Sequence, residues 1–211
     1  EEETKLDEGG ADRVESLKKE INYSFMLEDL DALIQNFEEG AERIHSIIMD
    51  LKTFSRMDSD EFQLVNIHES IDLALNLLHS EYRDSIRIHK EFGNLPVVEC
   101  HPGKMSQVFL NLLVNACQAI CQEGDIWIRT RSKNEMALVE IEDNGSGIAQ
   151  PNLEKIFEPF FTTKPVGKGT GLGLSISYGI VQQHQGNIRV ESSEGKGTKF
   201  QVQLPFDSMH G

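Results

Sequence analysis

The sequence has few cysteines, few basic residues and no long apolar segment. No apolar run approaches the roughly 18 residues that span a membrane, and no charged and then apolar leader opens the chain. Three cysteines, an odd number, fit a reducing compartment better than a disulfide framework. These absences predict a soluble, cytoplasmic chain.

The scarcity of positive charge limits the partners that the chain can bind. It contains 20 Lys and Arg against 35 Asp and Glu, for a formal net charge of −15. Duplex nucleic acid is not an expected partner, because its binding depends on basic side chains that release counterions. ATP stays compatible, since one pocket can be locally positive. With 211 residues, 38% of them hydrophobic, we expect one full domain and a smaller element.

The smaller element is predicted in the first part of the chain. Residues 1–23 are rich in acidic side chains and predict a solvated linker or a helix stump. Residues 24–58 predict a long helix with a heptad seam, whose members are Leu27, Leu30, Ile34, Phe37, Ala41, Ile44, Ile48 and Leu51. Such a seam needs another helix or a second copy of the chain as its partner, or else it packs on its own domain.

The larger element, residues 62–207, alternates short strand patterns with helical ones. The strands are predicted at 62–65, 86–88, 125–131, 137–142, 188–192 and 199–204, and the helices near 71–78, 102–121 and 171–185. Asn66 and Glu69 form a predicted capping pair before the first of these helices. Because strands and helices are interleaved irregularly, we expect the α/β class, with a mixed sheet and helices on one face.

Four glycines at alternate positions lie where the last predicted helix begins, at Gly167, Gly169, Gly171 and Gly173. Glycine frees the backbone to approach a ligand closely, so that consecutive N–H groups can converge on a phosphate at the start of a helix. The spacing matches neither a Walker loop nor a Rossmann turn. It therefore predicts a phosphate site on a different fold.

Two further clusters suit a nucleotide. Asn111 and Asn115 lie four apart on one face of an apolar helix, where oxygen ligands suit Mg²⁺, although satisfied structural amides are the alternative. Asp143 ends a strand and is followed by Gly145 and Gly147, a pattern that fits either a carboxylate accepting from adenine under a tight turn or an ordinary hairpin turn.

A third cluster lies between the other two and the glycine loop. Residues 157–164, which we call the lid, combine aromatic anchors, hydroxyls and a lysine. Lys164 and Lys168 are placed to reach phosphates, and Gly167 and Gly169 provide hinges. A flexible surface loop with a local apolar cluster is the alternative.

Taken in order, these motifs resemble the N, G1, F, G2 and final glycine boxes of sensor histidine kinases of two-component systems. The matching residues are Asn111 and Asn115, then Asp143, Gly145 and Gly147, then Phe157, Pro159 and Phe160, then 169–173, then Gly195, Gly197 and Thr198. The similarity covers about 62–206, and the sequences of the lid and the second glycine box are similar to those of the nitrogen-regulatory type. Residues 50–56 resemble the end of the second helix of the dimerisation hairpin. The resemblance implies the Bergerat fold, an α/β sandwich that holds ATP under a mobile lid.

Carried onto this sequence, the resemblance assigns roles to single residues. It implies that Asn115 ligates Mg²⁺, Asn111 lies close to the reacting phosphate, Asp143 binds the adenine amino group, Gly147 leaves room for the ring and Thr198 lies near the base. Many relatives have a basic residue three positions after the metal-binding Asn, whereas this chain has Gln118. The implied residues for ATP or ADP are Asn111, Asn115, Asp143, Gly145, Gly147, Phe160, Thr162, Thr163, Lys164, Gly167, Lys168, Gly169, Thr170, Gly171, Leu172, Gly173, Leu174 and Thr198.

The residue that would receive the phosphoryl group is not recognisable. Relatives phosphorylate a His on the first hairpin helix, followed by an acidic residue, and none of the seven histidines has that setting. We therefore expect that helix to lie outside this sequence, in a homodimeric parent that can be membrane-anchored and that relays the phosphoryl group to the receiver domain of a response regulator. A hydrolysing ATPase of the same superfamily, or an ATP-binding module without chemistry, is the alternative. Related ATPases place a Glu where this chain has Asn111, which disfavours hydrolysis.

Overall fold

The computed structural model describes residues 61–78, 85–165 and 169–206, together with residues 13, 15–20, 22, 23, 25–27, 29, 30, 33, 34, 37 and 40. The chain divides into two compact units, Glu1–Ser46 and Ile47–Gly211. In the part of the chain that is described, no helix is both long enough and apolar enough to cross a membrane.

The described residues of the first unit are helical on both sides of Asn22, whose backbone is left-handed with a φ of 52°. Four members of the predicted seam, Leu27, Leu30, Ile34 and Phe37, have exposed side chains. The other four members lie outside the described residues. The helix over 24–58 and its partner therefore stay predictions.

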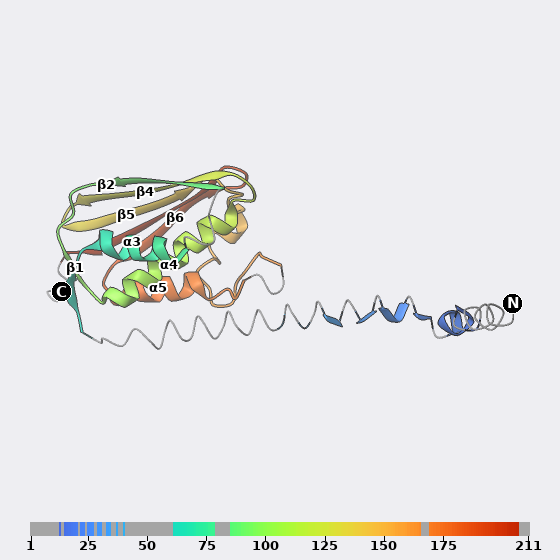
Figure 1. Ribbon diagram of the computed structural model, residues 1–211. Coiled ribbons are helices and arrows are strands. Elements are labelled where there is room, and N and C mark those ends of the chain that lie inside the picture. Colours follow the sequence, from blue (N-terminus) through green and yellow to red (C-terminus); the bar gives the residue numbers. More distant parts are fainter. Residues whose placement is uncertain are drawn as a thin grey trace. The chain divides into compact units, whose positions relative to one another are not determined.

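A five-stranded mixed sheet forms one layer of the second unit (Figure 1). Its order is β2-β4-β5-β7-β6, and only the β2–β4 pair is parallel. The strands are β2 (Ile86–Phe92), β4 (Gly124–Lys133), β5 (Met136–Asp143), β6 (Asn187–Ser193) and β7 (Gly197–Pro205). Two short strands, β1 (Gln63–Val65) and β3 (Val98–Cys100), form a separate antiparallel pair.

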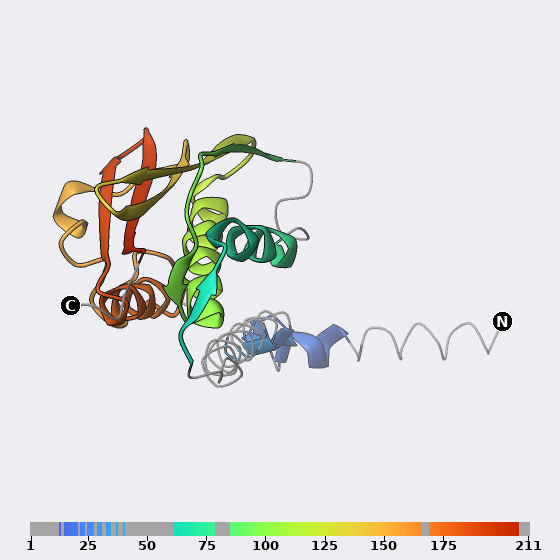
Figure 2. The same ribbon diagram turned by 90° about the vertical axis from the view of Figure 1, so that its left-hand side faces the viewer.

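Three helices cover one face of this sheet (Figures 1 and 2). They are α3 (Ile67–Leu78), α4 (Pro102–Ala119) and α5 (Gly173–Gln183), and a single 3-10 turn, η1 (Gln150–Asn152), precedes the lid. At the start of α3, the Asn66 side chain accepts from the His68 N–H at 3.1 Å and donates to Glu69 at 3.2 Å, which confirms the capping pair. The predicted helix at 102–121 ends at Ala119, because Ile120 has an extended backbone.

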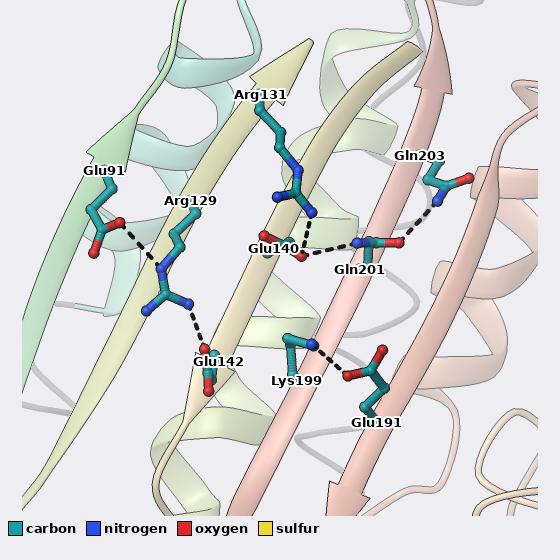
Figure 3. A network of polar contacts seen from close by, with 9 residues as sticks. All are labelled: Glu91, Arg129, Arg131, Glu140, Glu142, Glu191, Lys199, Gln201 and Gln203. Carbon is teal, nitrogen blue, oxygen red and sulfur yellow. Dashed lines mark hydrogen bonds and ion pairs between the residues drawn. The ribbon is translucent and has the colours of Figure 1, made fainter. Parts of the chain in front are cut away.

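Side chains along each strand alternate between the two faces of the sheet. Ile128, Ile141 and Val202 are buried against the helices, as the period of two in a half-buried strand requires. The opposite face carries a network of charged and amide side chains (Figure 3). In it, Arg131 lies 3.1 Å from Glu140, which also accepts from Gln201 at 2.9 Å. The α/β prediction, with a mixed sheet and helices on one face, is confirmed.

Candidate functional site

The predicted site residues are joined by contacts between distant parts of the chain. The turn after β5 is tied to the end of α4 by a hydrogen bond of 2.9 Å from the Ser146 N–H to the Ala119 carbonyl. Asp143 of β5 is paired with Thr198 of β7. The lid is tied to the glycine loop, where the Phe160 N–H donates to the Gly171 carbonyl at 2.9 Å. These contacts bring together segments that are far apart in sequence.

Asn111 is fixed between α4 and α5. Its side-chain nitrogen donates to the Gly173 carbonyl at 3.0 Å and to the Ser177 hydroxyl at 3.2 Å. These two bonds use both amide hydrogens, so the amide oxygen is the group that remains for a ligand. Ser177, fully buried, was not among the predicted site residues. Ser177 lies one helical turn after Gly173, and this spacing in the sequence could have identified it as a neighbour of the glycine loop.

Asp143 is a buried carboxylate at the end of β5, with 4% of its surface exposed. One of its oxygens accepts from the Gly145 N–H at 2.8 Å, and the carboxylate also accepts from the backbone N–H of Thr198. Burial raises the pKa of Asp143 to about 6, and these two hydrogen bonds oppose the rise only in part. The side chain is thus a hydrogen-bond acceptor enclosed by the protein.

The raised pKa of Asp143 predicts a specific dependence of stability on pH. Between about pH 4 and pH 6 the unfolded chain has already ionised this carboxyl while the folded chain retains the proton, so folding is favoured by low pH. As the pH rises through this window, the wild-type protein should lose about 3 kcal/mol of its free energy of unfolding relative to Asp143→Asn. Urea denaturation of both proteins at about pH 4 and pH 7.5 measures the difference. An equal change in the free energy of unfolding between the two pH values for both proteins would contradict the buried carboxyl.

Two glycines of the site are required by close approaches of the backbone. Gly147 has a φ of +68°, and a Cβ there would lie 2.1 Å from the Ser193 carbonyl oxygen. Gly171 also has a φ of +68°, and its Cβ would lie 2.4 Å from the backbone of Phe160. Both positions exclude a side chain because of the positive φ and the neighbouring backbone, whether or not a ligand is bound. That Gly147 leaves room for an adenine ring stays a prediction.

The lid differs from the prediction in its aromatic residues. Phe160 is 74% exposed and has a left-handed backbone with a φ of 67°, so it is not an anchor. Phe157 and Phe161 pack partly buried against the core, and Phe157 also contacts Tyr178, with 5.4 Å between ring centroids. These two aromatic side chains hold the lid to the domain.

The remaining predicted residues surround the glycine loop. Thr162 and Thr163 are exposed, and the Thr162 hydroxyl lies close to Gly169, where a Cβ would be 2.8 Å from it. The Leu172 N–H donates to the Thr170 hydroxyl at 3.3 Å, and Leu174 packs against the core from the first turn of α5. Gly167 and Lys168 lie outside the described residues.

Lys164 of the lid reaches across to α4. Its Nζ donates to the Asn115 amide oxygen at 3.1 Å and to the amide oxygen of Gln118. Burial lowers the pKa of Lys164. Position 118 has no basic side chain of its own, and Lys164 of the lid brings a positive charge to it. The two residues are 46 apart in sequence, so no local pattern predicts their contact.

Residues 100–208 match the family described as histidine kinase-, DNA gyrase B-, and HSP90-like ATPases. The match covers more than half of the chain, which therefore belongs to this family.

Among curated proteins, the chain is 39% identical over 189 residues to the sensor kinase CckA of Brucella abortus, covering 82% of this chain and 20% of that protein. It is 36% identical over 178 residues to the sensor histidine kinase ZraS of Escherichia coli, covering 83% of this chain and 38% of that protein. The chain thus spans between a fifth and two fifths of the length of these relatives.

The catalytic domain of the histidine kinase ThkA is similar in structure, with a TM-score of 0.64 and 34% identity over 70% of this chain and 97% of that domain. A structure of ThkA in complex with the response regulator protein TrrA matches with a TM-score of 0.65 and 27% identity, over 82% of this chain and 50% of that chain. The Bergerat fold implied by the sequence motifs is confirmed by these similarities.

Proposed function

We propose that this chain is the ATP-binding catalytic part of a sensor histidine kinase, which transfers the γ-phosphoryl group of ATP to a His on a hairpin helix outside this sequence. The observation that carries the proposal is the set of contacts that α4 makes with the other predicted segments. Asn111 donates to the Gly173 carbonyl, Asn115 accepts from Lys164 of the lid, and the Ala119 carbonyl accepts from the turn after β5. The enclosed Asp143 carboxylate suits the amine of adenine, and the amide and ammonium groups of α4 and the lid suit the phosphates.

Adenine recognition is assigned to Asp143 and the turn that follows it. The buried carboxylate is held by the Gly145 N–H and offers its remaining acceptor capacity to the exocyclic amine of adenine. Thr198 lies opposite Asp143 in the β5–β7 pair, and its hydroxyl lies 3.0 Å from that of Ser192. We assign this hydroxyl pair to extending the hydrogen-bond network to the base.

The residues present fit Mg²⁺ that arrives with the phosphates. The Asn115 oxygen already accepts from a cationic group, so it is a suitable ligand for a hard cation. No cluster of three or more His, Cys, Asp or Glu that could hold a metal is found among the described residues. We assign Asn115 as the protein ligand that would hold the metal, with phosphates and waters supplying its other ligands. When bound, Mg²⁺ would neutralise charge on the phosphates.

Asn111 distinguishes transfer from hydrolysis. Its side chain is an amide, held through its nitrogen by Gly173 and Ser177, and an amide cannot accept a proton from water as a general base does. An imidazole nucleophile needs no such base, and phosphoryl transfer depends mainly on positioning and charge neutralisation. Asn111 is therefore assigned to positioning the γ-phosphate, which favours a kinase over an ATPase.

Three protein partners follow from this proposal. The missing hairpin helix supplies the acceptor His, a second copy of the parent completes the hairpin bundle, and a response-regulator receiver domain accepts the phosphoryl group. The complex of the similar kinase ThkA with the response regulator TrrA supports the last of these. The cytoplasm, where ATP is available, is the compartment that the proposal requires.

Transfer in trans tests the proposal. The chain is incubated with γ-labelled ATP, Mg²⁺ and a hairpin fragment that carries the acceptor His, taken from the parent sequence. We expect acid-labile, base-stable label on the hairpin and none on the chain itself. Label that appears only as free phosphate would instead favour an ATPase, and bound ATP without any turnover would favour a binding module.

A further inference from the structure

Lys164 connects the lid to α4 at two points. Its Nζ donates to amide oxygens on Asn115 and Gln118, which lie three residues apart and so face the same side of α4. Within the lid, the Lys164 N–H donates to the Thr162 hydroxyl at 3.2 Å, which sets the direction of the backbone at this residue. The lid is thus docked on α4 through one ammonium group.

One of these two acceptors is the proposed metal ligand. The Asn115 oxygen cannot hold an ammonium group and a divalent cation together without placing two positive charges a few ångströms apart. Partial burial of Lys164 makes this repulsion larger than it would be in water. Docking of Lys164 and metal binding at Asn115 therefore compete for the same oxygen.

The other acceptor has no part in the proposed nucleotide site. Gln118 is exposed, and its contact with Lys164 belongs to the docked arrangement. A group that stabilises only the docked arrangement works against any ligand that must displace it.

From this geometry we propose that Lys164, Asn115 and Gln118 form a latch that holds the lid on α4 and that Mg²⁺–nucleotide opens. The proposal rests on the function proposed above, because that function supplies the metal and the nucleotide. On opening, Lys164 leaves Asn115 and becomes available to the phosphates. By thermodynamic reciprocity, whatever weakens the latch strengthens binding of the ligand that opens it.

The substitution Gln118→Met separates the latch from a simple phosphate contact. If Gln118 helped to bind phosphate, its removal would weaken binding. The latch predicts the opposite, about three- to tenfold tighter binding of ADP with Mg²⁺, since one hydrogen bond of the competing arrangement is lost. Calorimetric titration of wild type, Gln118→Met and the matched control Gln122→Met, at an exposed glutamine after α4, measures this. Unchanged or weaker binding in Gln118→Met overturns the latch.

Hydrogen exchange of the lid without nucleotide provides an independent readout. We expect faster amide exchange at residues 160–164 in Gln118→Met and in Lys164→Met than in the wild type and in Gln122→Met. Equal exchange in all four proteins overturns the latch. Failure of the wild type to bind ADP would instead reject the proposed function, and the exchange measurement would still decide whether Lys164 holds the lid.

Discussion

Replacing Asp143 by Asn is expected to weaken the binding of ADP about 100-fold. A hydrogen bond to a charged acceptor contributes about 1.5–3 kcal/mol, and the substituted amide keeps the shape of the carboxyl while losing its charge. Asn can still accept from the Gly145 N–H, so the turn after β5 has no reason to change. Calorimetric titration of ADP, with and without Mg²⁺, measures the loss.

The stability of Asp143→Asn provides the control for this prediction. Because ionising the buried Asp143 opposes folding, the variant should be at least as stable as the wild type near neutral pH. A loss of binding then cannot be attributed to unfolding. Full affinity in a stable Asp143→Asn protein would remove this carboxyl from the adenine site.

Replacing Asn115 by Ala is expected to lower the rate of phosphoryl transfer to the hairpin about 1000-fold. The alanine removes the one protein ligand assigned to the metal, and the loss of a single electrostatic contact to a reacting group costs about 10²- to 10³-fold in many enzymes. Single-turnover transfer of label from ATP, with the hairpin fragment in trans, measures the rate.

Binding without metal distinguishes this defect from damage to the whole pocket. In EDTA, Asn115→Ala should bind ADP no more weakly than the wild type, because Asp143 and the glycine loop are untouched. Gln122→Ala, at an exposed position, is the matched control and should transfer at the wild-type rate. Transfer by Asn115→Ala at the wild-type rate would contradict the assignment of the metal ligand.

Much of the fold is predictable because local periodicity reports which face is buried. In β5 the alternation of Val139, Ile141 and Asp143 places the carboxyl on the same side as the core residues, so its burial follows from the sequence. The same holds for Asn111, whose position among leucines on α4 points it toward α5.

The parts that could not be predicted depend on contacts between distant residues or on backbone conformations that are rare for the residue type. Phe160 has a left-handed backbone and an exposed ring, against the expectation for an aromatic residue in an apolar cluster. The contact of Lys164 with Gln118 joins a lid to a helix across 46 residues, and the sequence carries no periodic pattern for it. Both lie in the lid, where tertiary contacts rather than local propensity decide the structure.

The most direct test of the nucleotide site is a titration of the wild-type chain with Mg²⁺–ADP and, separately, with Mg²⁺–GDP. The two ligands share their phosphates and metal, whereas guanine has a carbonyl oxygen where adenine has the amine that Asp143 is assigned to accept from. We predict saturable binding of ADP at one site and at least about 100-fold weaker binding of GDP. Equal affinity for both nucleotides, or no binding of either, would contradict the account.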